Sequence, residues 1–155
     1  MAAEVYSLAT PLPLERARDI VRGALAEGRR RELMPLTVCV LDVGGNLIAM
    51  EREDGCGVAR LEVAQGKAYG ALSLGIGGRT IAGRYKGREA FLNAAAAATA
   101  GRFVAAPGGV LVLDGNGQAV GAVGVSGDVS DEDEAAALAG LSAAGLKAGV
   151  DPAAD

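Results

Sequence analysis

Two short stretches have the pattern of a β-hairpin, and they constrain the fold more than any other feature. Residues 36–42 (LTVCVLD) form an apolar run rich in β-branched side chains, and the turn VGGN separates them from a second run at residues 47–52 (LIAMER). Residues 109–113 (GVLVL) and 118–125 (QAVGAVGV) are joined through DGNG in the same way. Because a tight turn can join only antiparallel strands, this pairing favours an antiparallel sheet over a doubly wound parallel one.

Four further stretches have the pattern of helices. Residues 14–33 place apolar side chains at helical spacing, with arginine and glutamate on the opposite face, and we also predict helices over residues 60–74, 88–102 and 132–147. Residues 75–87 (GIGGRTIAGRYKG) are predicted to form a glycine-rich basic loop. The order helix, two strands, two helices, two strands, helix predicts an α/β (α+β) fold, with helices around a central antiparallel sheet.

Length and composition narrow the class of protein. The 155 residues are the length of one domain, so we predict a single domain over residues 1–155, with flexible tails at 1–10 and 148–155. A net charge of −4 argues against nucleic-acid binding. No apolar run reaches the length of a membrane span, and no signal peptide is recognisable. The two cysteines do not suggest a disulfide framework, so a cytoplasmic location is expected.

The chain contains no histidine. This composition excludes Ser-His-Asp and Cys-His catalysis, zinc held by histidine, and a haem iron with a histidine ligand. No metal-ligand set is predicted. If haem binds, its iron needs tyrosine, cysteine, methionine or a surface contact instead.

The glycine-rich stretch at residues 120–140 (VGAVGVSGDVSDEDEAAALAG) does not match a nucleotide, nucleophile or calcium site. It lacks the GxGxxG motif of dinucleotide-binding sites and the Gly-Lys-Ser/Thr of a P-loop. It also lacks the GxSxG motif of a serine nucleophile and the glycine at the sixth position of a calcium loop. Ser130 and Asp133 instead have the spacing of a capping box, and the acids at 131–134 suit the start of a helix. The strand glycines indicate that another element packs tightly over them.

Three stretches resemble the GlcG/HbpS family. They are GAVGVSGDVSDEDEAAALAG (residues 121–140), VLDVGGNLIAMEREDG (residues 40–55) and EVAQGKAYGAL (residues 62–72), and they occur in the family's order over almost the whole chain. The resemblance implies a central antiparallel sheet of about five strands, similar to profilin-like domains, and a homo-oligomer. Family members are known as haem-binding proteins and as the C-terminal domain of some corrinoid adenosyltransferases, so a fold is implied more firmly than an activity.

Lys67 is the first candidate for a functional residue, because it lies between Gly66 and Ala68 on a stretch of the helix that is otherwise small or apolar. A partly buried lysine can act as a base, a Schiff-base nucleophile or an anion clamp, or it can simply pair with a carboxylate. Asp42 ends a predicted strand and is either an acid or the cap of an Asx turn. Arg52 and Asp54 flank a turn, where they form either an ion pair or a site for a ligand carboxylate.

Four other residues are candidates for ligand binding. Ser126 and Gly127 lie between glycine turns, where the hydroxyl could donate to a ligand or cap the backbone. Tyr69 is a possible phenol acid or haem ligand, or a packing residue. Arg79 belongs to the basic stretch at residues 75–87, which is either a solvated loop or a lid over an anionic ligand.

Two functions follow from these candidates. The first is binding of a small organic ligand, with a tetrapyrrole (haem or corrinoid) as the leading class implied by the resemblance. The alternative is a cofactor-free lyase or isomerase acting on a small hydroxy or keto acid, with Lys67 as base and Asp42 or Asp54 as acid. A third possibility is an assembly subunit without a ligand. In all cases we expect a homo-oligomer that binds neither nucleic acid nor membrane.

Overall fold

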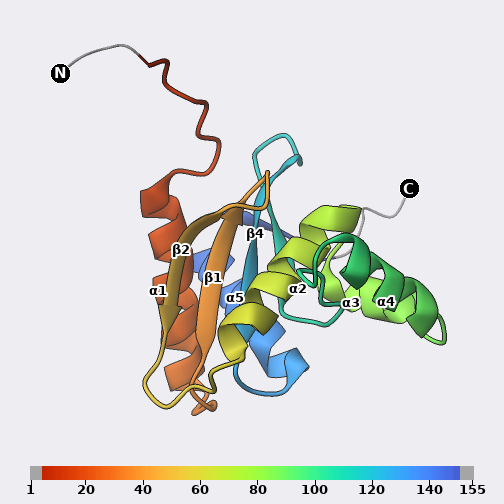
Figure 1. Cartoon of the computed structure of the whole chain (residues 1–155). Helices are drawn as coiled ribbons and strands as arrows, with labels where there is room; N and C mark the ends of the chain where they lie inside the picture. Colours follow the sequence, from red (N-terminus) through yellow and green to blue (C-terminus); the bar gives the residue numbers. More distant parts are fainter. Residues whose placement is uncertain (1–4, 151–155) are drawn as a thin grey trace.

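The computed structural model describes residues 5–150, which contain five helices and five strands (Figure 1). Both predicted hairpins are present, and the last strand is an addition that the sequence did not suggest. In chain order the elements are α1 (Leu14–Arg30), β1 (Thr37–Asp42), β2 (Leu47–Arg52), α2 (Arg60–Leu74), α3 (Gly78–Arg84), α4 (Glu89–Ala98), β3 (Gly109–Leu113), β4 (Ala119–Ser126), α5 (Ser130–Ala143) and β5 (Lys147–Gly149).

The strands form one open sheet in the order β2-β1-β4-β3-β5, and every neighbouring pair is antiparallel. The two hairpins lie side by side because β1 also pairs with β4, with Cys39 opposite Gly124. The predicted fold class, a central antiparallel sheet of five strands flanked by helices, is therefore confirmed.

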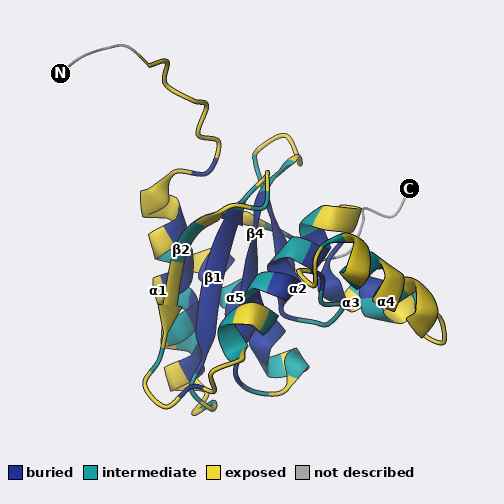
Figure 2. Ribbon diagram, in the orientation of Figure 1, coloured by how far each residue is buried: buried dark blue, intermediate teal, exposed yellow. Residues whose placement is uncertain are grey.

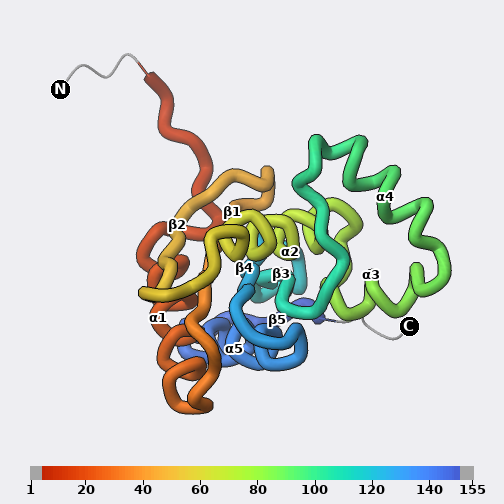
Figure 3. The backbone as a smooth tube through the Cα atoms, turned by 60° about the horizontal axis from the view of Figure 1, so that its bottom comes forward, coloured from red at the N-terminus to blue at the C-terminus, as the bar shows by residue number. Residues whose placement is uncertain are grey.

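Helices cover both faces of this sheet (Figures 1 and 3). α1 and α5 pack on the face that carries Val38 and Val40 of β1, whereas α2 packs on the face that carries Cys39 and Leu41. This alternation follows from the two-residue period of a strand, and it explains why β1 is apolar on both faces. Figure 2 shows the sheet centre as the most deeply buried part of the molecule.

Small residues allow these layers to approach closely, as the sequence predicted. A Cβ atom added to Gly124 of β4 would lie 1.9 Å from the carbonyl oxygen of Ala64 in α2. On the other face, a Cβ atom added to Gly140 of α5 would lie 2.5 Å from the carbonyl oxygen of Ile20 in α1. Glycine at both positions lets backbone pack directly on backbone, which compensates for the cost of glycine in regular structure.

The basic stretch at residues 75–87 is not the loop that its glycines predicted, because α3 forms within it. Gly75 ends α2 in a left-handed conformation (φ 69°), and the fully buried Ile81 of α3 packs with Ile76 and Phe103 in a small separate core. Burial of Ile81 therefore overrides the low helix propensity of the segment. α3 and α4 project together from one side of the sheet, and α4 has no fully buried residue (Figures 1 and 2).

Three other expectations at the ends of elements are wrong. The last helix ends at Ala143, and Lys147–Gly149 is not helix or tail but strand β5, which pairs with β3. The predicted capping box is absent because Val129 is the N-cap and Asp133 is used elsewhere. Residues 5–10 lack regular structure and are exposed, while residues 1–4 and 151–155 of the predicted tails lie outside the described range.

Candidate functional site

Lys67 forms a buried ion pair that connects α2 to the start of α5. Its Nζ atom lies 2.8 Å from Asp133 Oδ2 and donates a second hydrogen bond to the carbonyl oxygen of Val125 at 3.0 Å. Only 3% of the Lys67 side chain and 1% of the Asp133 side chain are exposed. The carboxylate partner that a structural role of Lys67 predicts is therefore present, together with a backbone carbonyl.

Backbone geometry explains how a lysine of α2 reaches a carboxylate of α5. A Cβ atom at Gly109 would lie 2.1 Å from the Lys67 carbonyl oxygen, and one at Gly108 would lie 3.0 Å from Nζ. The side chain thus passes the glycine-lined start of β3. Asp133 lies in the first turn of α5, where the helix dipole favours a carboxylate. The Oδ1 atom of Asp133 accepts a hydrogen bond from the backbone N–H of Asp128 at 2.9 Å.

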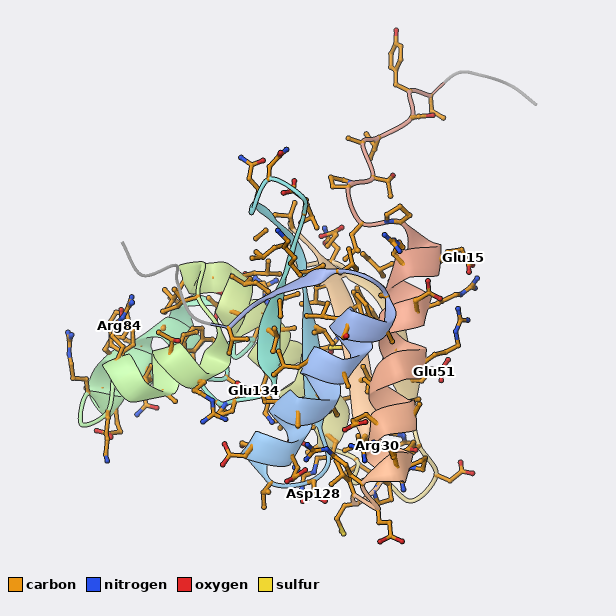
Figure 4. The ribbon with its side chains drawn as sticks, turned by 180° about the vertical axis from the view of Figure 1, so that it is seen from behind. Glu15, Arg30, Glu51, Arg84, Asp128 and Glu134 are labelled. Atoms are coloured by element: carbon orange, nitrogen blue, oxygen red, sulfur yellow. The ribbon has the colours of Figure 1, made fainter. Side chains whose placement is uncertain are left out.

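Arg79 is held by two carboxylates of α5. Its guanidinium lies 2.6 Å from Asp131 Oδ1 and 2.8 Å from Glu134 Oε1, and hydrogen bonds to Asp131 and then Glu134 raise the pKa of Arg79 above its ordinary value. Glu134 lies between α5 and the α3–α4 projection (Figure 4). Its Oε2 atom is buried and has no hydrogen-bond partner within residues 5–150. Arg79 therefore connects α3 to α5 through two ion pairs.

Tyr69 lines a hollow of about 250 Å³ that we call the Tyr69 pocket. Arg102, in the segment after α4, covers the ring of Tyr69, with 4.3 Å between its Cζ atom and the ring centroid. A Cβ atom at Gly45 would lie 2.9 Å from the same ring, so the β1–β2 turn also packs against it. The lining residues are Leu41, Gly45, Glu62, Gln65, Gly66, Tyr69, Ala100, Gly101 and Arg102.

The Tyr69 pocket is lined by Leu41, by glycine and alanine, and by the polar side chains of Glu62, Gln65, Tyr69 and Arg102. Small-molecule sites likewise combine apolar surface with a small number of polar groups. The phenol can ligate a metal or donate a hydrogen bond, and the guanidinium can bind a carboxylate. Arg102 was not singled out from the sequence, because nothing near it in the chain distinguishes it from other surface arginines.

Arg52 and Asp54 lie elsewhere, on a shallow hollow of about 480 Å³ that also contains Arg29 and Glu53. Both are exposed, and neither takes part in an ion pair within residues 5–150. Glu53, between them, accepts from Arg29 and from the backbone N–H of Leu36. This surface is therefore polar and open.

Asp42 closes the β1–β2 turn. Its Oδ1 atom accepts the backbone N–H groups of Gly44 and Asn46, each at 2.9 Å, which is the Asx-turn interpretation that the sequence left open. Ser126 is fully buried, and its Oγ atom accepts a hydrogen bond from Arg60 Nη1 at 3.2 Å. Gly127 packs against the chain, since a Cβ atom there would lie 2.3 Å from the carbonyl oxygen of Pro35.

The candidates from the sequence are thus spread over several places rather than gathered in one cavity. Of these residues, Tyr69 lines the Tyr69 pocket, and Arg52 with Asp54 lines the open hollow at the other end of β2. Lys67, Ser126 and Arg79 make their polar contacts with other parts of the chain.

No helix within residues 5–150 has the length and apolarity needed to cross a membrane.

Comparisons with known proteins agree with this fold. The family model described as "Haem degrading protein HbpS-like" matches residues 12–142. The chain is 26% identical to HbpS (TM-score 0.73, covering 92% of this chain and 95% of that one) and 27% identical to a doubly substituted HbpS from Streptomyces reticuli (TM-score 0.73, 92% of each chain). The PduOC–haem complex is similar in fold, with a TM-score of 0.79 at 19% identity over 90% of this chain and 99% of that one.

No curated protein sequence matches the chain. The family match nevertheless spans most of the chain, including all three stretches that carry the resemblance and the whole of β1 to β4. It confirms the GlcG/HbpS resemblance drawn from those stretches. The chain belongs to the HbpS-like family of haem-degrading proteins.

Proposed function

We propose that this protein binds a tetrapyrrole, with haem as the leading ligand, at the Tyr69 pocket. The observation that carries the proposal is the pairing of one phenol and one guanidinium in a hollow that Leu41 and Ala100 also line. Membership of the HbpS-like family supports this ligand class, as does the resemblance in fold to a protein solved with haem. Corrinoid binding is a second possibility within the same ligand class.

The residues of the pocket fit haem in two respects. Tyrosine can ligate haem iron, and Tyr69 would be the residue to do so in a chain without histidine. Arg102 holds its guanidinium over the Tyr69 ring, and its terminal N–H groups could pair there with a propionate. Bound haem would supply the redox chemistry of its iron, and the chain would position the macrocycle and shield its apolar edge.

The size of the pocket predicts weak retention. Its volume of about 250 Å³ is below the range of roughly 300–1,000 Å³ that is usual for drug-sized ligands. A macrocycle would therefore be held by one edge, with the rest in solvent or against another subunit. We expect reversible binding rather than a permanently held prosthetic group.

A lyase or isomerase gains no support from the family or from the structural neighbours. The Lys67 ammonium, its intended base, is held by Asp133 and Val125 and does not line the Tyr69 pocket. Tetrapyrrole binding is the better-supported function.

Titration of the protein with haem, followed by absorption spectroscopy, tests the proposal. We expect saturable binding with a tyrosinate-type spectrum, which Tyr69→Phe abolishes and the matched control Tyr85→Phe leaves unchanged. Arg102→Gln should weaken binding by up to about fivefold, because one ion pair is lost at an exposed site. Absence of saturable binding, or the same spectrum for Tyr69→Phe, would refute the proposed site.

A further inference from the structure

The projection formed by α3 and α4 differs in charge from the rest of the molecule. Residues 76–103 contain five basic side chains and one acidic side chain, a net charge of +4, whereas the whole chain carries −4. The remainder of the chain therefore carries −8. A positive field confined to one part of an acidic molecule attracts partners of negative charge to that part alone.

Three of the basic side chains on the projection are exposed and have no carboxylate partner. Arg84 ends α3, Lys86 lies in the turn that follows, and Arg88 precedes α4 (Figure 4 labels Arg84). None of the three takes part in an ion pair within residues 5–150. On the opposite side of the sheet, five arginines of α1 and its C-terminal cap all pair with carboxylates, namely Arg18, Arg22, Arg29, Arg30 and Arg31.

Two aromatic rings hold one of these charges in position. Tyr85 and Phe91 are stacked, with 4.5 Å between their ring centroids and 18° between their planes. The Cζ atom of Arg88 lies 5.5 Å from the Tyr85 centroid and 5.8 Å from the Phe91 centroid. These cation–π contacts restrict the guanidinium, whose N–H groups suit a carboxylate. A side chain that is already restricted loses less entropy when a partner binds.

The outer side of α4 is lined by small apolar residues. α4 has no buried residue, and Figure 2 shows most of it in the colour of exposed residues. Ala90, Ala94 and Ala97 are exposed and share one face of the helix by their spacing, while Phe91 is 38% exposed. Alanine lets a second helix approach closely, because the distance between packed helices depends on the side chains at the contact.

We propose that the exposed side of α4, together with Arg84, Lys86 and Arg88, is a docking surface for an acidic helix of a partner protein. The partner helix lies along the alanines of α4, and its carboxylates pair with the three cations near the N-terminal end of α4. A short helix fits better than nucleic acid, because the remainder of the chain, at −8, repels phosphates that extend past the projection. It also fits better than a bilayer, which needs larger apolar side chains than alanine. The three cations do not line the Tyr69 pocket, so the inference goes beyond the proposed haem site.

Fluorescence anisotropy with the full chain tests the role of charge. The probe is a labelled synthetic helix of glutamate, alanine and leucine, and the control peptide has glutamine in place of glutamate. We expect binding of the acidic peptide only, with an affinity that falls as salt is added. Arg84→Gln/Arg88→Gln should weaken binding about three- to tenfold, because two exposed ion pairs are lost. Arg18→Gln/Arg22→Gln, which changes the net charge equally on α1, should have no effect. Failure to bind the acidic peptide, or equal losses in the two double variants, overturns the proposal.

A neutral substitution tests whether the peptide packs on α4. Ala94→Gln keeps a good helix former but adds a longer side chain to the surface, so binding should weaken at least about threefold. Ala26→Gln is the matched control, because Ala26 is an exposed alanine of α1. Unchanged affinity for Ala94→Gln would mean that charge alone attracts the peptide, and would overturn the docked helix. Tighter binding of phosphatidylserine vesicles or of a single-stranded oligonucleotide than of the acidic peptide would identify another class of partner, and also overturns the proposal.

Discussion

Replacing Lys67 with methionine would leave the Asp133 carboxylate buried without its counter-charge. Both side chains are almost fully excluded from water, and the native pair has 2.8 Å between Nζ and Oδ2. Removing one partner of a buried pair usually costs about 3–5 kcal/mol. Methionine preserves most of the volume of the lysine stem, and Asp133 keeps the hydrogen bond from the Asp128 N–H, so we expect a loss near the lower limit, about 3 kcal/mol.

A second substitution separates the charge from the packing. Asp133→Asn removes the negative charge but keeps an acceptor for the backbone N–H of Asp128. In Lys67→Met/Asp133→Asn neither buried charge remains, so the double variant should be more stable than the sum of the two single losses predicts. A coupling free energy of about 2 kcal/mol is expected for partners in direct contact.

Urea unfolding at neutral pH measures these free energies. Lys86→Met is the matched control, because Lys86 is exposed in the α3–α4 turn and its replacement should change stability by less than about 0.5 kcal/mol. The haem affinity of folded Lys67→Met should be unchanged, since Lys67 does not line the Tyr69 pocket. A loss below about 1 kcal/mol for Lys67→Met, or additive losses in the double variant, would show that the ion pair does not hold α2 to α5.

Two further predictions concern close packing and a buried thiol. Gly124→Ala should cost at least about 2 kcal/mol in thermal unfolding, because its Cβ atom would lie 1.9 Å from the Ala64 carbonyl oxygen. Gly115→Ala, with nothing within 4 Å, should stay within about 0.5 kcal/mol, and equal effects would contradict the close approach of α2. Burial raises the pKa of the Cys39 thiol from 9.0 to about 12, so stability should fall from pH 9 toward pH 12 by up to about 1.4 kcal/mol per pH unit. Urea unfolding at pH 8 and pH 10 should show that Cys39→Ala loses this part of the pH dependence. An equal fall in the free energy of unfolding for Cys39→Ala and for the unsubstituted protein would disprove the role of this thiol.

The hairpins could be predicted from the sequence because their signals are local. Alternating or β-branched runs and a turn capped by an aspartate lie within a few residues of one another. Asp42 and Asp114 each accept two backbone N–H groups of their own turn, so the turn chemistry needs no help from the rest of the chain. α3 and β5 lack such signals. α3 depends on burial of Ile81 in a separate core, and the three residues of β5 are held by pairing with β3.

The candidate site shows the same division. The sequence alone identified Lys67 and Tyr69 as unusual, because a charge and an aromatic ring are conspicuous on a helix of small residues. Their partners are distant: Asp133 lies 66 residues from Lys67, and Arg102 reaches Tyr69 from the segment after α4. Local composition determines which side chains are available and which elements form. Only the fold decides whether a side chain meets a carboxylate in the core or faces a cavity, because those contacts depend on chain closure over long sequence separations.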